Sequence, residues 1–182
     1  MEKLKEIFLQ KYITPPEFDN IIMNSDGEFL TGLCFEGSPN ACKLAPAAHE
    51  KRLDIFDKTR NWLDMYFGGI EPDFTPEYKI SNLTPFRKQV IDIMCKIPYG
   101  ETVTYNDIAK EIAERNKIRK MSAQAVGGAI GRNLICIIVP CHRVVGSNGS
   151  LVGYGGGIKN KVSLLRLEGQ DMNQFTLPKK IM

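Results

Sequence analysis

The stretch from Ile137 to Gly157, IIVPCHRVVGSNGSLVGYGGG, is the part of the sequence around which the rest is organised. It begins with four apolar residues that end at Pro140, and a short apolar run of this kind predicts a buried strand. Proline cannot donate a hydrogen bond within a sheet, so the strand is expected to end there. Cys141 and His142 follow directly, which places a thiol and an imidazole where the predicted strand stops.

A cysteine beside a histidine is a candidate for nucleophilic catalysis. The reactive form is the thiolate, and free cysteine, with a pKa of about 8.5, is ionised to only a few per cent at neutral pH. His142 could accept the proton of Cys141, directly or through a water. The alternative is structural, because cysteine is among the most buried residue types and many histidines only hydrogen-bond within a core. Glycines 153–157, around Tyr154, would let the backbone approach a flat ligand.

Three helices are predicted before this stretch. The first begins at Thr84 and Pro85, a capping residue followed by a proline suited to the first helical position. The second begins at the cap Thr104, with an aspartate placed for a capping box, and the third begins at Ser122 after a basic connection. The second and third helices are short and closely joined, which predicts a helix-turn-helix.

The last of these helices contains two adjacent glycines, Gly127 and Gly128. Glycine costs about 1 kcal/mol relative to alanine inside a helix, so local stability does not explain them. Close approach of another surface does, and that surface is either a packed neighbour within the protein or the groove of a nucleic acid.

The remaining elements frame the central stretch. Strands are predicted at Ile21–Met23 and Phe29–Phe35, and a helix from near Ala47 to Phe67, where two glycines end it. A final helix is expected at Lys159–Leu167, followed by a basic and poorly ordered tail from Asp171 onwards.

Charge is distributed unevenly along the chain. Residues 1–80 carry nine Lys/Arg and fourteen Asp/Glu, whereas residues 81–182 carry fifteen and seven. The basic second part favours a polyanionic partner, although basic faces are often merely solvated. No apolar run approaches the roughly 20 residues needed to cross a bilayer, and the N-terminus lacks a signal-peptide core. We therefore expect a monomeric cytoplasmic protein with no membrane partner.

The chain has five cysteines, an odd number without regular spacing, which favours free thiols in a reducing compartment. Cys34, Cys42 and His49 offer three potential metal ligands, but their spacing fits no strong zinc pattern. We expect neither a metal nor a cofactor.

The central stretch resembles the active-site signature of the O6-alkylguanine-DNA alkyltransferases, also called methylated-DNA–protein-cysteine methyltransferases. The resemblance rests on PCHRVV, the GSNGSL that follows and the GYGGG after it. It covers roughly Thr84 to Gly169 and is only general before that. It implies repair of double-stranded DNA by transfer of an alkyl group from guanine O6 to Cys141. The group stays on the protein, so each molecule acts once. O4-alkylthymine is a second candidate substrate.

The resemblance also implies catalytic roles. Cys141 would be the nucleophile, His142 the base acting through a water, and Glu168 the residue that orients the imidazole and balances its charge. Tyr105 would donate a hydrogen bond to the guanine ring, with a purely structural tyrosine as the alternative. Asn133 would tie the recognition helix to the active-site strand.

The damaged base would be rotated out of the duplex into a pocket, as enzymes acting on bases require. The main chain at Val144 would accept a hydrogen bond from the guanine exocyclic amine. Tyr154 and Gly155 would form a lid, and Ile130 would help to set the width of the pocket.

DNA contacts are implied for the helix-turn-helix, whose second helix enters the minor groove in this family. Asn106, Ser122 and Ser147 are in positions to meet phosphates. Gln124 stands where many members carry an arginine that fills the space left by the flipped base. Glutamine can bond the orphaned cytosine but lacks charge, so weaker DNA affinity with retained chemistry is expected. The lengthened basic loop 115–120 would compensate through phosphate contacts.

The predicted fold class is an α/β N-terminal lobe, with a small sheet and a helix, followed by a mainly α C-terminal lobe with the helix-turn-helix and the active-site cysteine. We expect the division to fall between residues 1–80 and 81–182. Three other functions are weighed against transfer: a reader of alkylated bases, a thiol-based alkylation sensor on DNA, and a Cys-His-Glu hydrolase. A reader is disfavoured because such relatives replace the cysteine that Cys141 supplies here.

Overall fold

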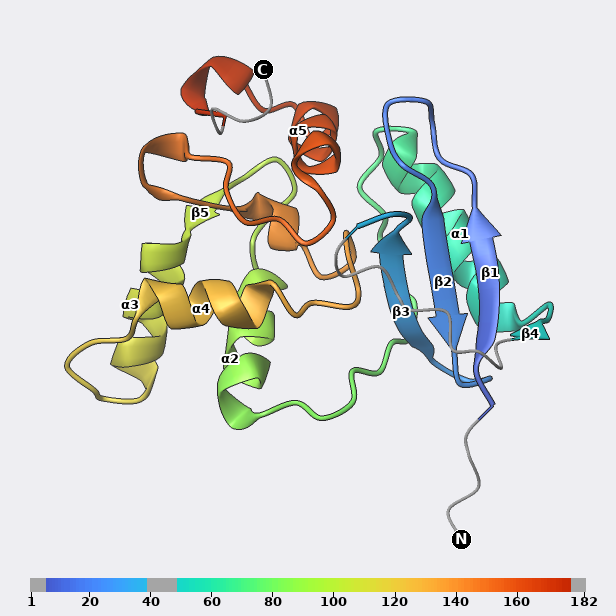
Figure 1. The fold of residues 1–182 in the computed structure, drawn as a ribbon, viewed down its shortest axis with the longest axis horizontal. Coiled ribbons are helices and arrows are strands. Elements are labelled where there is room, and N and C mark those ends of the chain that lie inside the picture. The colour runs from blue at the N-terminus through green and yellow to red at the C-terminus, as the bar shows by residue number, and fades with distance from the viewer. Residues whose placement is uncertain (1–5, 39–48, 178–182) are drawn as a thin grey trace, which may run out of the picture.

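The computed structural model describes residues 6–38 and 49–177, without the side chains of residues 49 and 50. A four-stranded sheet forms one side of the molecule (Figure 1). Its strands lie in the order β3-β2-β1-β4, with β1, β2 and β3 antiparallel and β4 parallel to β1. They are β1 (Phe8–Tyr12), β2 (Ile21–Ser25), β3 (Leu30–Phe35) and β4 (His49–Glu50). The two strands expected from the sequence are confirmed as β2 and β3, whereas β1 was not predicted.

Helix α1 (Asp54–Phe67) covers one face of this sheet (Figure 1). The prediction that it begins near Ala47 is wrong, because His49 and Glu50 are extended and pair with β1. The helix starts after the extended residue Leu53, and acidic residues at its first turn favour that start by their interaction with the helix dipole. Its end before Gly68 and Gly69 is confirmed.

The C-terminal part is mainly helical and contains α2 (Pro85–Met94), α3 (Tyr105–Arg115), α4 (Ala123–Ile130) and α5 (Ile158–Leu167). The predicted caps are present: Thr84 accepts from Arg87, Ser122 from Ala125, and Thr104 forms a capping box with Asp107. Helices α3 and α4 lie side by side, joined by residues 116–122 (Figure 1). The helix-turn-helix is thus confirmed. Strands β5 (Val103–Thr104) and β6 (Val144–Val145) form a two-stranded parallel pair.

The outer edge of β3 joins the two parts of the molecule. Leu33 donates from its backbone to Leu134 at 2.7 Å and accepts from Cys136 at 2.8 Å. Leu30 pairs in the same way with the segment around Tyr78. The residues that lead into the central stretch are therefore held against the sheet by backbone hydrogen bonds, and one hydrophobic core runs through both parts.

The strand predicted before Pro140 is wrong. Ile135 makes a single bridge to β3, and Ile137 then takes a φ of +69°, which a β-branched residue rarely adopts. Val139 donates to the Ile135 carbonyl at 3.0 Å, so the run forms a buried turn that satisfies its own backbone. The apolar residues are buried as expected, but burial alone does not distinguish a strand from a turn.

The tail from Asp171 is more ordered than expected. Residues Met172–Gln174 form the 3-10 helix η3, and Thr176 pairs with Ser150. Residues 178–182 of the expected tail lie outside the described part. Within residues 6–38 and 49–177, no helix is both long and apolar enough to cross a membrane.

Candidate active site

Cys141 opens the 3-10 helix η1 (Cys141–Arg143), and its side chain is buried. Asn133, which follows α4, donates from Nδ2 to the Cys141 Sγ at 3.0 Å and to the Val139 carbonyl at the same distance. Its Oδ1 accepts from the Ile135 backbone at 3.0 Å. A single buried amide therefore fixes the turn before the cysteine and the cysteine sulfur itself.

The surroundings of Cys141 favour its ionised form. A hydrogen bond from the Cys136 thiol lowers the pKa of Cys141. Burial acts in the opposite direction, while the hydrogen bond from Asn133 and the charge of Lys161 lower the pKa further. The thiolate is the nucleophilic form of cysteine, so a lowered pKa increases the fraction of the reactive form.

His142 and Glu168 form the buried pair that the sequence resemblance implied. His142 Nε2 lies 2.8 Å from Glu168 Oε1, and both side chains are fully buried. Burial lowers the pKa of His142, so the imidazole is neutral at neutral pH. Its Nδ1 is buried and has no hydrogen-bond partner among the described residues.

Arg143 and Gly100 complete the environment of the Glu168 carboxylate. Arg143 donates from Nε to Oε2 at 3.0 Å and from its terminal nitrogen to Oε1 at 2.9 Å, and the Gly100 amide donates to Oε2 at 3.3 Å. Burial raises the pKa of Glu168, but the hydrogen bonds and charges of His142 and Arg143 outweigh it and lower the value to about 2. Glu168 is therefore an anion throughout the neutral range.

Two further buried residues reach this region. Tyr66 of α1 donates to Glu168 Oε1 at 2.6 Å. Lys161 of α5 is fully buried and donates to the Val144 carbonyl at 2.6 Å, and burial lowers its pKa to about 8. Its Nζ lies 5.8 Å from the centre of the Tyr154 ring. A cation and a phenol thus lie near the thiol.

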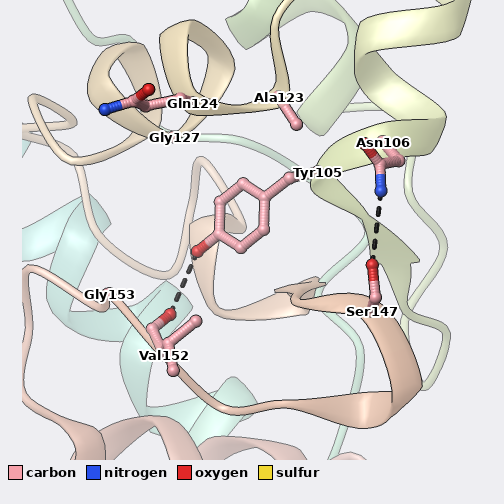
Figure 2. Close-up of a pocket in the computed structure, with 8 residues that line it drawn as sticks. All are labelled: Tyr105, Asn106, Ala123, Gln124, Gly127, Ser147, Val152 and Gly153. Carbon is pink, nitrogen blue, oxygen red and sulfur yellow. Dashed lines mark hydrogen bonds between the residues drawn. The ribbon is translucent and has the colours of Figure 1, made fainter.

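A surface cavity of about 400 Å³ lies over α3 and α4 (Figure 2). Tyr105 stands in its centre, and its hydroxyl donates to the Val152 carbonyl at 3.1 Å. On another side of the cavity, the Asn106 side-chain amide donates to the Ser147 hydroxyl at 3.2 Å. The lining residues are Tyr105, Asn106, Ala123, Gln124, Gly127, Ser147, Val152 and Gly153.

Cys141 is not among the residues that line this cavity. The pairing of β5 with β6 holds Thr104, and so the start of α3, against the residues that follow η1. Tyr105 and the loop at Val152 and Gly153 line the cavity together, and the Tyr105 hydroxyl points to the Val152 carbonyl (Figure 2). A ligand in this cavity would therefore contact Tyr105.

The two glycines of α4 differ in their surroundings. A Cβ at Gly127 would lie 3.8 Å from the Tyr105 ring, an ordinary contact, whereas a Cβ at Gly128 would meet nothing within 4 Å. Packing within the protein therefore does not require a glycine at position 128. Gln124 is exposed on the same helix, and Ser122 caps it.

Other residues expected at the site do not line this surface cavity. Ile130 is buried in the core and does not line the cavity, and Gly155 does not line it either. The Val144 carbonyl, expected to accept from guanine, accepts from Lys161. Cys34 is buried in β3. Cys42 lies outside the described residues, so the metal-ligand trio is not assessed.

Sequence reasoning missed Tyr66, Arg143, Lys161 and Cys136. Arg143 lies within the PCHRVV motif, and its place in that motif could have identified it as a site residue. Nothing in the local sequence of Tyr66 indicates a polar partner in the other half of the chain.

Comparison with known proteins agrees with this arrangement. The family profile described as "6-O-methylguanine DNA methyltransferase, DNA binding domain" matches residues 85–170. The inducible methylated-DNA–protein-cysteine methyltransferase of Bacillus subtilis is 36% identical over 181 residues, covering 90% of this chain and 97% of that protein. The corresponding enzyme of Mycobacterium leprae is 43% identical over 113 residues, which cover 62% of this chain and 65% of that protein.

A solved structure shares the overall fold. The crystal structure of Mycobacterium tuberculosis OGT in complex with DNA superposes with a TM-score of 0.73 at 32% identity, over 93% of this chain and 94% of that one. Its sheet lobe and helical lobe correspond to those described above. The likeness to the Bacillus enzyme extends over nearly the whole of both proteins, so the chain belongs to the methylated-DNA–protein-cysteine methyltransferase family.

Proposed function

We propose that this protein repairs double-stranded DNA by transferring an alkyl group from guanine O6 to Cys141, once per molecule. The observation that carries the proposal is the buried Cys141 sulfur, held by Asn133 and with a lowered pKa, beside a neutral His142 whose Nδ1 has no partner among the described residues. Membership of the methyltransferase family supports the same reaction.

The reaction is a displacement at the alkyl carbon. The Cys141 proton passes through a water to His142 Nδ1, and Glu168 stabilises the imidazolium that forms. The sulfur then attacks, so that the S–C bond forms while the C–O6 bond breaks and its electron pair stays on guanine. The guanine takes up a proton, and Tyr105 eases its departure by donating a hydrogen bond to the ring. No later step frees the thioether.

Binding requires the damaged base to leave the duplex. Helix α4 would lie in the minor groove, with the bare backbone at Gly128 allowing close approach and Gln124 occupying the space left by the base. Asn106, Ser122 and Ser147 would contact phosphates. Tyr154, Gly155, the Val144 main chain and Ile130 would shape the inner pocket once the bond between Tyr105 and Val152 opens.

We further propose that residues 1–80 and 81–182 are the two domains of a monomer, and that the protein works in a reducing cytoplasm. Cys95, Cys136 and Cys141 form no disulfide, which supports that compartment.

The test is the intact mass of the protein after it is mixed with a duplex that carries one O6-methylguanine. We expect one added methyl per molecule, mapped to Cys141, and none in a Cys141→Ala variant. Lesion-selective binding without a mass gain would contradict transfer and favour a base reader. A methyl on Cys136 would keep the reaction and reassign the nucleophile.

A further inference from the structure

Tyr66 belongs to the N-terminal helix α1, but its hydroxyl lies within the polar cluster around Glu168. It donates to Glu168 Oε1 at 2.6 Å, and its oxygen lies 3.3 Å from His142 Nε2. The residue is only 1% exposed. A buried phenol needs a hydrogen-bond partner, and a carboxylate forms one of the stronger bonds available to it.

The ring of Tyr66 is held from several sides. It stacks on Trp62 with centroids 5.3 Å apart and planes 8° apart. It meets the Tyr99 ring edge-on at 6.0 Å and the His142 ring at 6.5 Å. The hydroxyl is therefore aimed by a packed ring with little freedom to turn away from Glu168.

The hydrogen-bond inventory fixes the direction of each proton. An ionised carboxylate only accepts, so the Tyr66 proton points to Glu168 and the Tyr66 oxygen is left as an acceptor. His142 Nε2 faces both the Glu168 oxygen and the Tyr66 oxygen, so its proton sits on Nε2. Nδ1 is then the nitrogen with a free lone pair, which is the atom that the transfer reaction needs as its base.

We infer that Tyr66 is a positioning residue for alkyl transfer, which holds Glu168 in place and favours the His142 tautomer with its proton on Nε2. The inference rests on the proposed function, because it assigns Tyr66 a part in that reaction. Tyr66 touches neither the thiol nor the alkyl group. It acts through Glu168 and His142, and through it the N-terminal lobe supplies a part of the catalytic apparatus.

Removal of the hydroxyl has a predictable electrostatic effect. In Tyr66→Phe the packed ring remains, but Glu168 loses one donor and more of its negative charge acts on His142. Arg143 and Lys161 face His142 as cations and lower its pKa, whereas Glu168 raises it. The pKa of His142 should therefore rise, and the limb of the rate profile along which His142 loses its proton should move to higher pH.

Tyr12 provides a matched control. Its hydroxyl donates to Asp64 Oδ1 at 2.7 Å, so it also makes a bond from a tyrosine to a carboxylate. Asp64 lies on α1, the helix that carries Tyr66. Neither Tyr12 nor Asp64 belongs to the polar cluster around Glu168. Tyr12→Phe therefore removes a tyrosine–carboxylate bond, here to an exposed carboxylate, without touching the site.

The experiment measures single-turnover methyl transfer by the wild type, Tyr66→Phe and Tyr12→Phe from weakly acidic to weakly alkaline pH. We expect Tyr66→Phe to be about 10-fold slower at neutral pH, the value of one hydrogen bond to a charged group. The curve of its rate against pH should move to higher pH by about half a unit or more. Tyr12→Phe should match the wild type in both respects. In Glu168→Gln, the addition of Tyr66→Phe should have little further effect, since both residues act together.

If Tyr66→Phe has the wild-type rate and the same dependence on pH, the inference is overturned and the proposed function stands. If the wild type transfers no methyl, the proposed function itself is overturned. Equal slowing of both tyrosine variants without a pH displacement would reduce Tyr66 to a structural residue. A readout independent of repair uses the two histidines of the chain. Nitrogen NMR of the wild type should find the His142 proton on Nε2, and the opposite tautomer would refute the inference even if Tyr66→Phe failed to fold.

Discussion

The cluster around Glu168 and the cavity over α4 are two neighbouring regions built in opposite ways. In the cluster, Tyr66, His142 and Arg143 are buried and converge on one carboxylate. Gln124, which lines the cavity, is exposed, and so is Gly128 on the same helix, where an added Cβ would meet nothing within 4 Å. Buried side chains joined by several hydrogen bonds form a rigid network. An exposed surface with small side chains can adapt to a nucleic acid that arrives from outside. The proposed chemistry and the proposed DNA binding thus fall in separate regions.

The largest effect should come from the buried side. His142→Ala removes the proposed base, so single-turnover methyl transfer at neutral pH should fall by about 1000-fold, within the usual range for general-base catalysis. Affinity for the lesion duplex should be unchanged, because His142 is buried away from the cavity. A rate within a few-fold of the wild type would mean that the low pKa of Cys141 suffices without a base.

Acid should break the same cluster. The pKa of Glu168 is lowered from 4.5 to about 2, so the ionised carboxylate stabilises the fold above about pH 4.5, and this contribution is lost as the pH falls through about 2. The wild type should lose about 3 kcal/mol more than Glu168→Gln over that interval. Denaturant unfolding of both proteins at several pH values measures the difference. If the unfolding free energies of the two proteins change in parallel with pH, the hydrogen bonds to Glu168 do not stabilise the fold.

Asn133 tests the junction between the two regions. Asn133→Ala leaves the Val139 carbonyl and the Ile135 amide without their buried partner, which should cost about 2 kcal/mol of unfolding free energy. It also removes one donor to Cys141, so the thiol pKa should rise. Denaturant unfolding and the ultraviolet absorbance of the thiolate measure the two effects. Asn116→Ala, which breaks an exposed pair with Gln89, is the matched control and should change neither.

The smallest effect belongs to the exposed cavity. Gln124→Arg should tighten DNA binding about five-fold and steepen its salt dependence by about one counterion, because it adds a cation near the phosphates. Methyl transfer from bound DNA should not change. Fluorescence anisotropy at several salt concentrations gives both affinity and slope. Gln89→Arg adds the same charge away from the cavity, and an equal gain there would attribute the effect to net charge alone.

The sequence predicted the parts of the site that are local. Cys141 and His142 are adjacent, the caps at Thr84, Thr104 and Ser122 are read from two or three neighbouring residues, and the three helices that they start are found as expected. The error at residues 137–139 has a clear cause. An apolar run reports burial, and the positive φ of Ile137 is imposed by the bridge to β3 on one side and by Asn133 on the other.

By itself the sequence determined the chemical groups that are available, the helix-turn-helix and the family signature, because each depends on residues close together in the chain. Only the tertiary structure decided which carboxylate meets His142, that Arg143 and Tyr66 share it, and that Lys161 lies near the thiol. The hydrogen bonds to Glu168 among these contacts join residues 25 to 102 positions apart. No local pattern specifies such pairings, since they follow from how the edge of β3, the end of α1 and the end of α5 pack around one core.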